Sequence, residues 1–282
     1  MRDFSNDHSA LALNTATLGH MIDGHGFGWS PEKVIDACAA RGFAGIVFWQ
    51  REVGDRAVAI GERVRAAGMD VVGLCRSPFL VGKGTSNDLN EAKAAVDMAA
   101  ALETRALTVV SGGTEPGTRG VLESQKRFAD RVAMLAAYAQ QRGVSLALEP
   151  LNPMFGGNRT CLMTVRDALR VCDMVDSPNV GIAVDVYHVW WDTTLAESLM
   201  QAGSKRILSY HLCDWLEDTR DMLLDRGMMG DGVADLKSIR RAVEAAGYAG
   251  PCEVEIFSAK HWWKREPGDV LDIMVDRFRR DC

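Results

Sequence analysis

The sequence predicts an α/β fold, a single closed (β/α)8 barrel over residues 1–282, and three observations support this prediction. Short apolar segments closed by glycine or polar residues recur at roughly thirty-residue spacing. Segments with helical periodicity separate them, and strict strand–helix alternation is typical of a parallel sheet covered by helices. The length of 282 residues also suits one barrel, because this fold usually fills about 250 residues.

Eight segments are candidate strands. They cover residues 10–18, 43–49, 70–77, 106–113, 144–152, 180–188, 207–215 and 252–258. Helical patterns lie between them, and the one after Ser30 begins with a cap residue followed by Pro31, a favoured helix start. The first strand is not followed by GxGxxG, so the sequence does not favour an open dinucleotide-binding sheet.

Composition excludes several classes of partner. The formal net charge is −6 and no block of Lys or Arg stands out, which argues against a nucleic-acid partner. No run approaches the roughly 18 apolar residues of a membrane span, and the first residues do not resemble a secretory signal. The seven cysteines are scattered without a CxxC, as expected for reduced thiols in the cytoplasm.

The ends of the last four predicted strands carry the functional prediction. Strand residues alternate between two faces, and here one face is apolar while the other runs from small to polar residues. In the segment 207–215, for example, Leu208, Tyr210 and Leu212 should face the helices. The polar residues expected to point at the barrel axis near the C-terminal rim are Glu149, Asp185, His211 and Glu255. That rim is where barrel enzymes hold their active sites.

Each of these four residues taken alone is adequately explained by an ion pair, a turn cap or a buried hydrogen bond. Together they place three carboxylates in one poorly solvated mouth, where their mutual repulsion calls for a cation. The equivalent strand positions contain no set of Lys or Arg. The pattern therefore predicts one divalent metal ion, and oxygen-rich ligation with one imidazole favours Mn²⁺, with Mg²⁺, Co²⁺ and Zn²⁺ as alternatives.

The same strand ends resemble the xylose-isomerase-like superfamily of sugar isomerases and epimerases, which are TIM barrels. The resemblance lies in the motifs ALEPLNP, VDVYHVWWD, YHLCDW with DRGMMGDG, and EVEIFS. It implies that the four rim residues are metal ligands and that Glu149 and Glu255 also form the acid–base pair. It further implies that His188 and Arg226 bind substrate oxygens.

Three further residues bear on the site. Glu253 is expected on the same face as Glu255 but one layer deeper. It is therefore either a competing metal ligand or a residue that pairs with a ligand from the second layer. Trp49 ends the second strand, where an indole at the mouth can cover the C–H face of a sugar. Asp231, in the glycine-rich segment 227–232, would repel an anion, which favours an unphosphorylated substrate.

These residues predict an enzyme that removes a proton next to a carbonyl of a sugar or keto-polyol, forming an enediolate that leads to an epimer or isomer. A lyase resembling inosose dehydratase, or one that cleaves keto-glycosides by β-elimination, shares the first step and remains the alternative. A nuclease like endonuclease IV is disfavoured, because that class needs a multi-zinc cluster rich in histidine. This chain has six histidines in total and a net negative charge. A non-catalytic sensor and a homo-oligomer both remain open.

Overall fold

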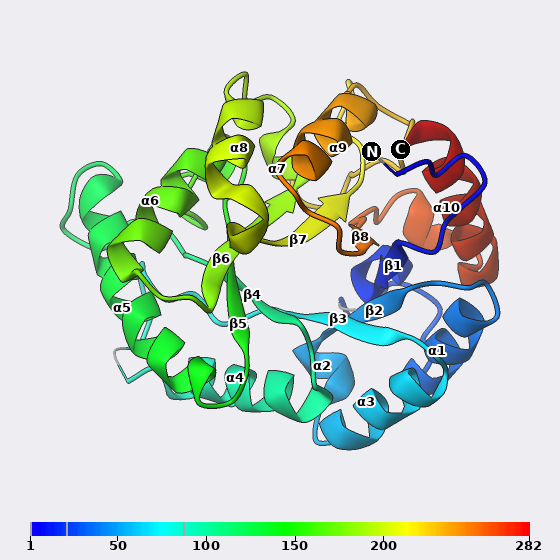
Figure 1. The fold of residues 1–282 in the computed structure, drawn as a ribbon, viewed down its shortest axis with the longest axis horizontal. Coiled ribbons are helices and arrows are strands. Elements are labelled where there is room, and N and C mark those ends of the chain that lie inside the picture. Colours follow the sequence, from blue (N-terminus) through cyan, green and yellow to red (C-terminus); the bar gives the residue numbers. More distant parts are fainter. Residues whose placement is uncertain (1, 21, 87) are drawn as a thin grey trace.

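The computed structural model describes residues 2–20, 22–86 and 88–282, and its strands form a closed barrel at the centre of the molecule (Figure 1). The strands are β1 (Leu11–Asn14), β2 (Gly45–Trp49), β3 (Asp70–Cys75), β4 (Ala106–Val110), β5 (Ser145–Glu149), β6 (Val180–Asp185), β7 (Ile207–Leu212) and β8 (Cys252–Val254). Each strand pairs in parallel with the next, and β8 pairs with β1. The predicted (β/α)8 barrel is therefore confirmed.

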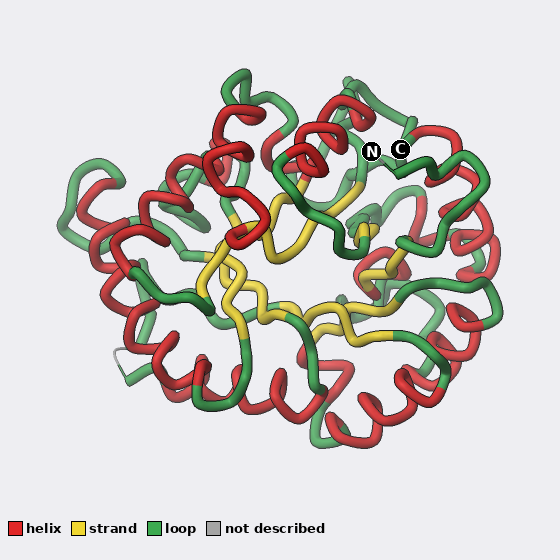
Figure 2. Tube along the Cα trace, viewed as in Figure 1, coloured by secondary structure: helices red, strands yellow, loops and turns green. Residues whose placement is uncertain are grey.

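Helices surround the strands as an outer ring (Figure 2). The longer helices are α1 (Pro31–Ala39), α3 (Ala57–Ala66), α4 (Asn90–Leu102), α5 (Leu122–Gln140), α6 (Val165–Val175), α8 (Leu195–Arg206), α9 (Leu236–Ala245) and α10 (Pro267–Asp281). Short helices follow two strands, α2 (Gln50–Val53) and α7 (Val186–Val189). Single turns of tighter 3-10 helix lie at Thr15–Leu18, Pro153–Phe155 and Trp262–Lys264. The expected cap of α1 is present, since the backbone N–H of Lys33 donates to the Ser30 hydroxyl.

One predicted strand face is wrong at Leu208. This side chain packs with Ala106, Ala147 and Ala183 inside the barrel rather than against the helices. The pairing of β6 with β7 is irregular at this point, because Ile182 pairs with Ile207 whereas Ala183 pairs with Ser209. The extra residue shifts the alternation by one at the start of β7, and it is regular again before His211.

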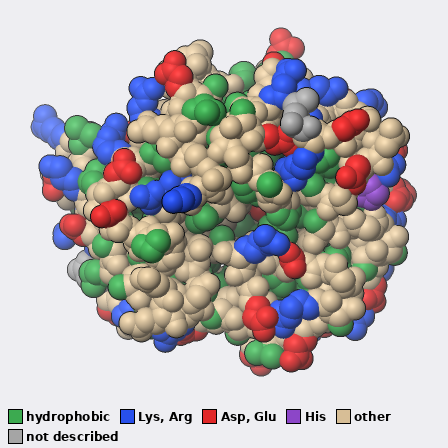
Figure 3. All heavy atoms as spheres, in the orientation of Figure 1, with side chains coloured by type: hydrophobic (Ala, Val, Ile, Leu, Met, Phe, Trp, Pro, Cys, Tyr) green, Lys and Arg blue, Asp and Glu red, His purple; other side chains and the backbone are tan. Residues whose placement is uncertain are grey.

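The two ends of the chain meet beside the β1–β8 pairing, where Figure 1 shows them together. The Phe4 and Phe278 rings stack with centroids 4.5 Å apart, and the Arg2 guanidinium pairs with the Glu244 carboxylate at 3.0 Å. Acidic and basic side chains are mixed over the face shown in Figure 3. Among the described residues, no helix combines the length and the apolar character that crossing a bilayer requires.

Candidate metal and active site

The structure brings Glu149, Asp185, His211 and Glu255 together at the C-terminal rim of the barrel. Glu149 ends β5, Asp185 ends β6, His211 is the penultimate residue of β7, and Glu255 directly follows β8. All four side chains are buried, and one ligand atom from each lies within 4.8 Å of the others. Convergence follows from the topology, because the carboxyl ends of parallel strands share one rim.

His211 is oriented as a metal ligand would be. Its Nε2 lies 3.1 Å from the Ser209 hydroxyl and 3.3 Å from the Glu253 carboxylate. If Nε2 carries the proton of the neutral ring, Nδ1 keeps a free lone pair. Nδ1 is buried and forms no hydrogen bond with any residue that the structure describes, and it lies 3.3 Å from Glu149 and 3.8 Å from Glu255. An unpaired nitrogen facing two carboxylates fits a cation between them.

The electrostatics of the cluster also favour a bound cation. Burial raises the pKa of Glu255 well above its usual value, and the negative charges of Glu149 and Asp185 add to this shift. Burial would lower the pKa of His211, but the neighbouring Glu253, Glu149 and Glu255 carboxylates outweigh it and raise that pKa well above its usual value. Without a bound cation, protons on these groups would balance part of the negative charge of the cluster.

Arg226 lies directly against two of the rim carboxylates. Its Nη1 donates to Asp185 at 2.8 Å and to Glu255 at 3.2 Å. The long segment that carries Arg226 is held at the rim because the Arg226 N–H donates to the Phe257 carbonyl. One guanidinium offsets one of the clustered carboxylate charges, so it does not remove the need for a cation.

His188, in α7, is a neutral hydrogen-bond donor in this site. The backbone N–H of Asn152 donates to its Nδ1 at 3.2 Å, which leaves the ring proton on Nε2. Burial lowers the pKa of His188 to about 4, although Asp185 opposes that shift. In this tautomer Nε2 and Arg226 Nη2, 3.4 Å apart, are both donors and do not bond to each other, while Asp185 lies 3.7 Å from Nε2. Arg226 and His188 thus form one polar wall beside the cluster.

A cavity of about 120 Å³ opens onto these groups. Its lining residues are Ile22, Trp49, Arg76, Val110, Glu149, Leu151, Phe155, Arg159, His188, Leu223, Arg226, Glu255 and Phe257. Trp49 therefore lies at the mouth, edge-on to the Phe257 ring at 5.8 Å. Asp231 is absent from this lining, and its carboxylate pairs with Arg277 at 3.0 Å. The expectation of an unphosphorylated substrate rested on the Asp231 carboxylate, which thus lies outside the cavity.

Asn14 is a site residue that the sequence reasoning missed. Its Nδ2 donates to Glu253 at 2.6 Å and to Glu255 at 3.0 Å, while its Oδ1 accepts from Trp49 Nε1 at 2.9 Å. The alternation rule could have found it, because Asn14 ends β1 on the face that also carries Ala12, buried inside the barrel. Asn14 thereby links the two glutamates to the indole at the mouth.

We expect Asn14→Asp to destabilise the metal-free protein by about 2–4 kcal/mol, because it removes two donors and adds a buried negative charge next to two carboxylates. Chemical denaturation monitored by circular dichroism measures the free energy of unfolding. Asn6→Asp, in an exposed segment, is the matched control and should change it by less than about 0.5 kcal/mol. Equal unfolding free energies for the two variants would contradict the role of Asn14.

Comparison with known proteins gives relatives of this architecture. An inosose isomerase of Bacillus subtilis strain 168 is 30% identical over 147 residues, which cover 50% of this chain and 50% of that protein. The chain thus spans about half the length of that curated relative. The solved structure of protein SMc04130 from Sinorhizobium meliloti 1021 is 40% identical, with a TM-score of 0.89 over 98% of this chain and 99% of that one.

Another solved structure, an IOLI protein with a bound zinc atom, is 20% identical and has a TM-score of 0.78 over 97% of this chain and 99% of that one. At this identity it demonstrates a shared fold. The model of the xylose isomerase-like TIM barrel family matches residues 35–276, which include all four rim residues. The chain therefore belongs to the xylose isomerase-like TIM barrel family.

Proposed function

We propose that this protein is a divalent-metal-dependent isomerase or epimerase that acts on a sugar or keto-polyol by moving a proton next to its carbonyl. The observation that carries the proposal is the placement of Glu149 and Glu255. Both lie beside the unpaired Nδ1 of His211, and both line the same cavity. Two carboxylates at one substrate cavity provide a base and an acid for proton transfer at carbon.

The chemistry of the donor set supports a metal in this site. A divalent ion held by Glu149, Asp185, His211 and Glu255 would polarise a carbonyl and its neighbouring hydroxyl, which acidifies the adjacent C–H. Three oxygen donors and one imidazole favour Mn²⁺, with Mg²⁺, Co²⁺ and Zn²⁺ as alternatives. Glu253, behind His211, would hold the imidazole in the tautomer that a ligand needs.

The chain's own groups then divide the work of proton transfer. One of Glu149 and Glu255 removes the proton from carbon, and the other returns one to the opposite face or to the neighbouring carbon. His188 Nε2 donates a hydrogen bond to a substrate oxygen, where negative charge develops in the enediolate. The fixed positive charge of Arg226 stabilises the same charge.

The aromatic walls exclude water and orient the substrate. Trp49 and Phe257 meet edge to face on one side of the cavity, and Phe155 lies edge-on to the His188 ring at 5.9 Å. Because the Trp49 N–H is already donated to Asn14, the indole offers its apolar surface to the C–H groups of a sugar. The site is thus shaped for a polyhydroxylated ring or chain.

We expect turnover in D2O to place deuterium from the solvent on the carbon next to the carbonyl. Metal-loaded protein would be incubated with a panel of ketoses and inososes, and exchange would be followed by proton NMR. Protein stripped with a chelator is the control, and restoring Mn²⁺ should restore exchange. Complete retention of the substrate hydrogen during fast turnover would exclude proton transfer through an enediolate.

The same experiment separates the outcomes that share this first step. An inverted or shifted hydroxyl in the product identifies an epimerase or isomerase. Loss of water, or of a larger group from the β carbon, identifies a lyase.

A further inference from the structure

Two arginines line the active-site cavity without a carboxylate partner. Arg76 follows β3, and Arg159 lies in the loop after β5. Within residues 2–20, 22–86 and 88–282, neither side chain forms an ion pair. The Arg76 Nη1 donates to the Ser77 carbonyl at 3.0 Å, so most of its donors remain free. By contrast, Arg226, which lines the same cavity, forms ion pairs with Asp185 and Glu255.

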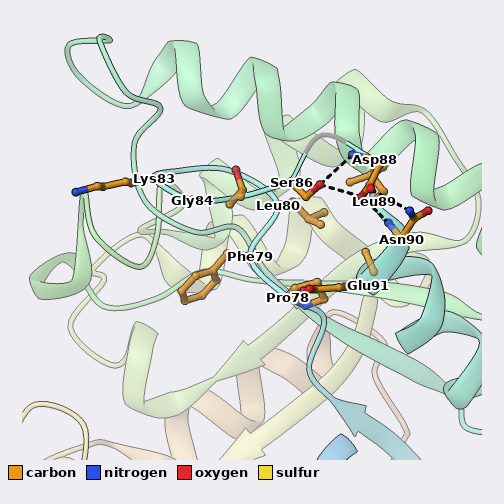
Figure 4. A pocket seen from close by; sticks show the side chains of 12 residues that line it. Pro78, Phe79, Leu80, Lys83, Gly84, Ser86, Asp88, Leu89, Asn90 and Glu91 are labelled. Carbon is orange, nitrogen blue, oxygen red and sulfur yellow. Dashed lines mark hydrogen bonds between the residues drawn. The ribbon is translucent and has the colours of Figure 1, made fainter.

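Aromatic rings hold the two guanidinium groups in place. The Arg76 guanidinium carbon lies 4.3 Å from the centre of the Phe79 ring, and that of Arg159 lies 5.9 Å from the same centre. Arg159 also lies 5.8 Å from the centre of the Phe155 ring, which itself lines the cavity. Figure 4 shows Phe79 directed away from Ser86 and Asp88 of its own loop. The loops after β3 and β5 thus place the guanidinium groups of both arginines near the Phe79 ring.

This arrangement holds two positive charges near each other in the cavity wall. Both arginines are partly buried, and burial together with the charge of Arg159 lowers the pKa of Arg76. Two like charges held close in a poorly solvated wall repel each other, and an anion between them would relieve that repulsion. Planar guanidinium groups are also suited to bidentate binding of a carboxylate or phosphate. Glu149, whose negative charge acts on Arg76 and opposes the lowering of its pKa, is a member of the proposed metal cluster.

We propose that the substrate carries an anionic group, a carboxylate or a phosphate, which Arg76 and Arg159 bind at the mouth above β3–β5. This inference rests on the proposed function and names its substrate class. The anion lies on the arginine side of the cavity, while the carbonyl and its neighbouring hydroxyl face Glu149 and Glu255. The arginines act as specificity residues that fix which end of the substrate reaches the metal cluster.

A matched set of ketoses tests the proposal. D-fructose is neutral, D-fructuronate carries a carboxylate at C6, and D-fructose 6-phosphate carries a phosphate there. Their affinities for Mn²⁺-loaded protein would be measured by titration calorimetry. We expect at least one anionic ketose to bind at least about thirtyfold more tightly than D-fructose, as a desolvated charge pair implies. Preference for one anion over the other distinguishes a carboxylate from a phosphate.

Variants assign the preference to the two arginines. Arg76→Gln and Arg159→Gln should each remove most of this preference, so that the anionic ketoses bind about as weakly as D-fructose does. Arg127→Gln, an exposed position on α5, makes the same change in net charge and should leave the preference intact. Arg76→Lys keeps the charge and replaces Arg76→Gln if that variant does not fold. Two results would overturn the proposal. One is equal binding of all three ketoses, and the other is a preference that survives when Arg76→Gln and Arg159→Gln are combined in one protein.

The proposed function can fail separately. If an anionic ketose binds through the arginines but neither it nor any sugar of the exchange panel takes up deuterium, the anionic substrate class is supported and proton transfer is not. If neutral ketoses exchange rapidly and the anionic ones bind no better, proton transfer is supported and the anion site is excluded.

Discussion

Glu149→Gln and Glu255→Gln should each lower kcat by about three to four orders of magnitude while part of the metal remains bound. The amide oxygen of glutamine can still face a cation, but the side chain cannot take up and return a proton at neutral pH. Each variant would be assayed for exchange and turnover after its metal content is measured, so that loss of the ion is separated from loss of the proton carrier.

Glu253→Gln is the matched control for this pair. It lies on the same strand segment, and its carboxylate faces His211 Nε2 and Asn14 instead of the cavity. Its kcat at saturating metal should therefore stay within about tenfold of the unaltered protein. A nearly normal kcat in Glu255→Gln together with an inactive Glu253→Gln would show that Glu253, and not Glu255, carries the acid–base role at this strand end.

The purified protein should carry about one divalent ion per chain, and His211→Gln or Asp185→Asn should greatly weaken its binding. Either change removes a donor from the four-residue cluster, and His211→Gln also exposes Glu149 and Glu255 to each other without the imidazole between them. We expect losses in affinity beyond the roughly 10–100-fold typical of changes behind a ligand, which is the range expected for Glu253→Gln.

Elemental analysis gives the stoichiometry, and titration against a competing chelator gives the affinity. The order of the three metal affinities tests which residues are ligands. His211→Gln and Asp185→Asn must lose more affinity than Glu253→Gln, which changes a residue behind His211. Fully active protein that contains no metal would end this interpretation.

Alternation along the strands was enough to predict the centre of the site. A period of two places every second residue on the axis, and a parallel barrel brings all strand ends to one rim. Alternation placed Glu149, Asp185 and His211 together, but at the last strand it left Glu253 as a competitor of Glu255, because both lie on the same face. Asn14 obeys the same rule and was missed only because an amide at a strand end was not considered beside carboxylates and imidazole.

The remaining features could not be predicted because they depend on geometry that alternation does not contain. The irregular pairing at Leu208 comes from how β6 and β7 fit together, and no local pattern marks it. Arg76 and Arg159 lie in loops that are far apart in the sequence, and only the folded chain brings both guanidinium groups near the Phe79 ring. Residues of this kind decide which substrate fits, so the sequence indicated a class of chemistry better than a ligand.

The pairing of β1 with β8 has a consequence for how the chain folds. Asn14, near the beginning of the chain, donates to Glu253 and Glu255, near its end, across this seam. During synthesis, β8 leaves the ribosome after the other seven strands of the barrel, so a nascent chain can hold an incomplete donor set before it can form the full cluster. Joining such distant segments is slow, because a long loop must be closed before any contact forms. An ion that binds only the closed barrel would therefore stabilise the product of its final folding step.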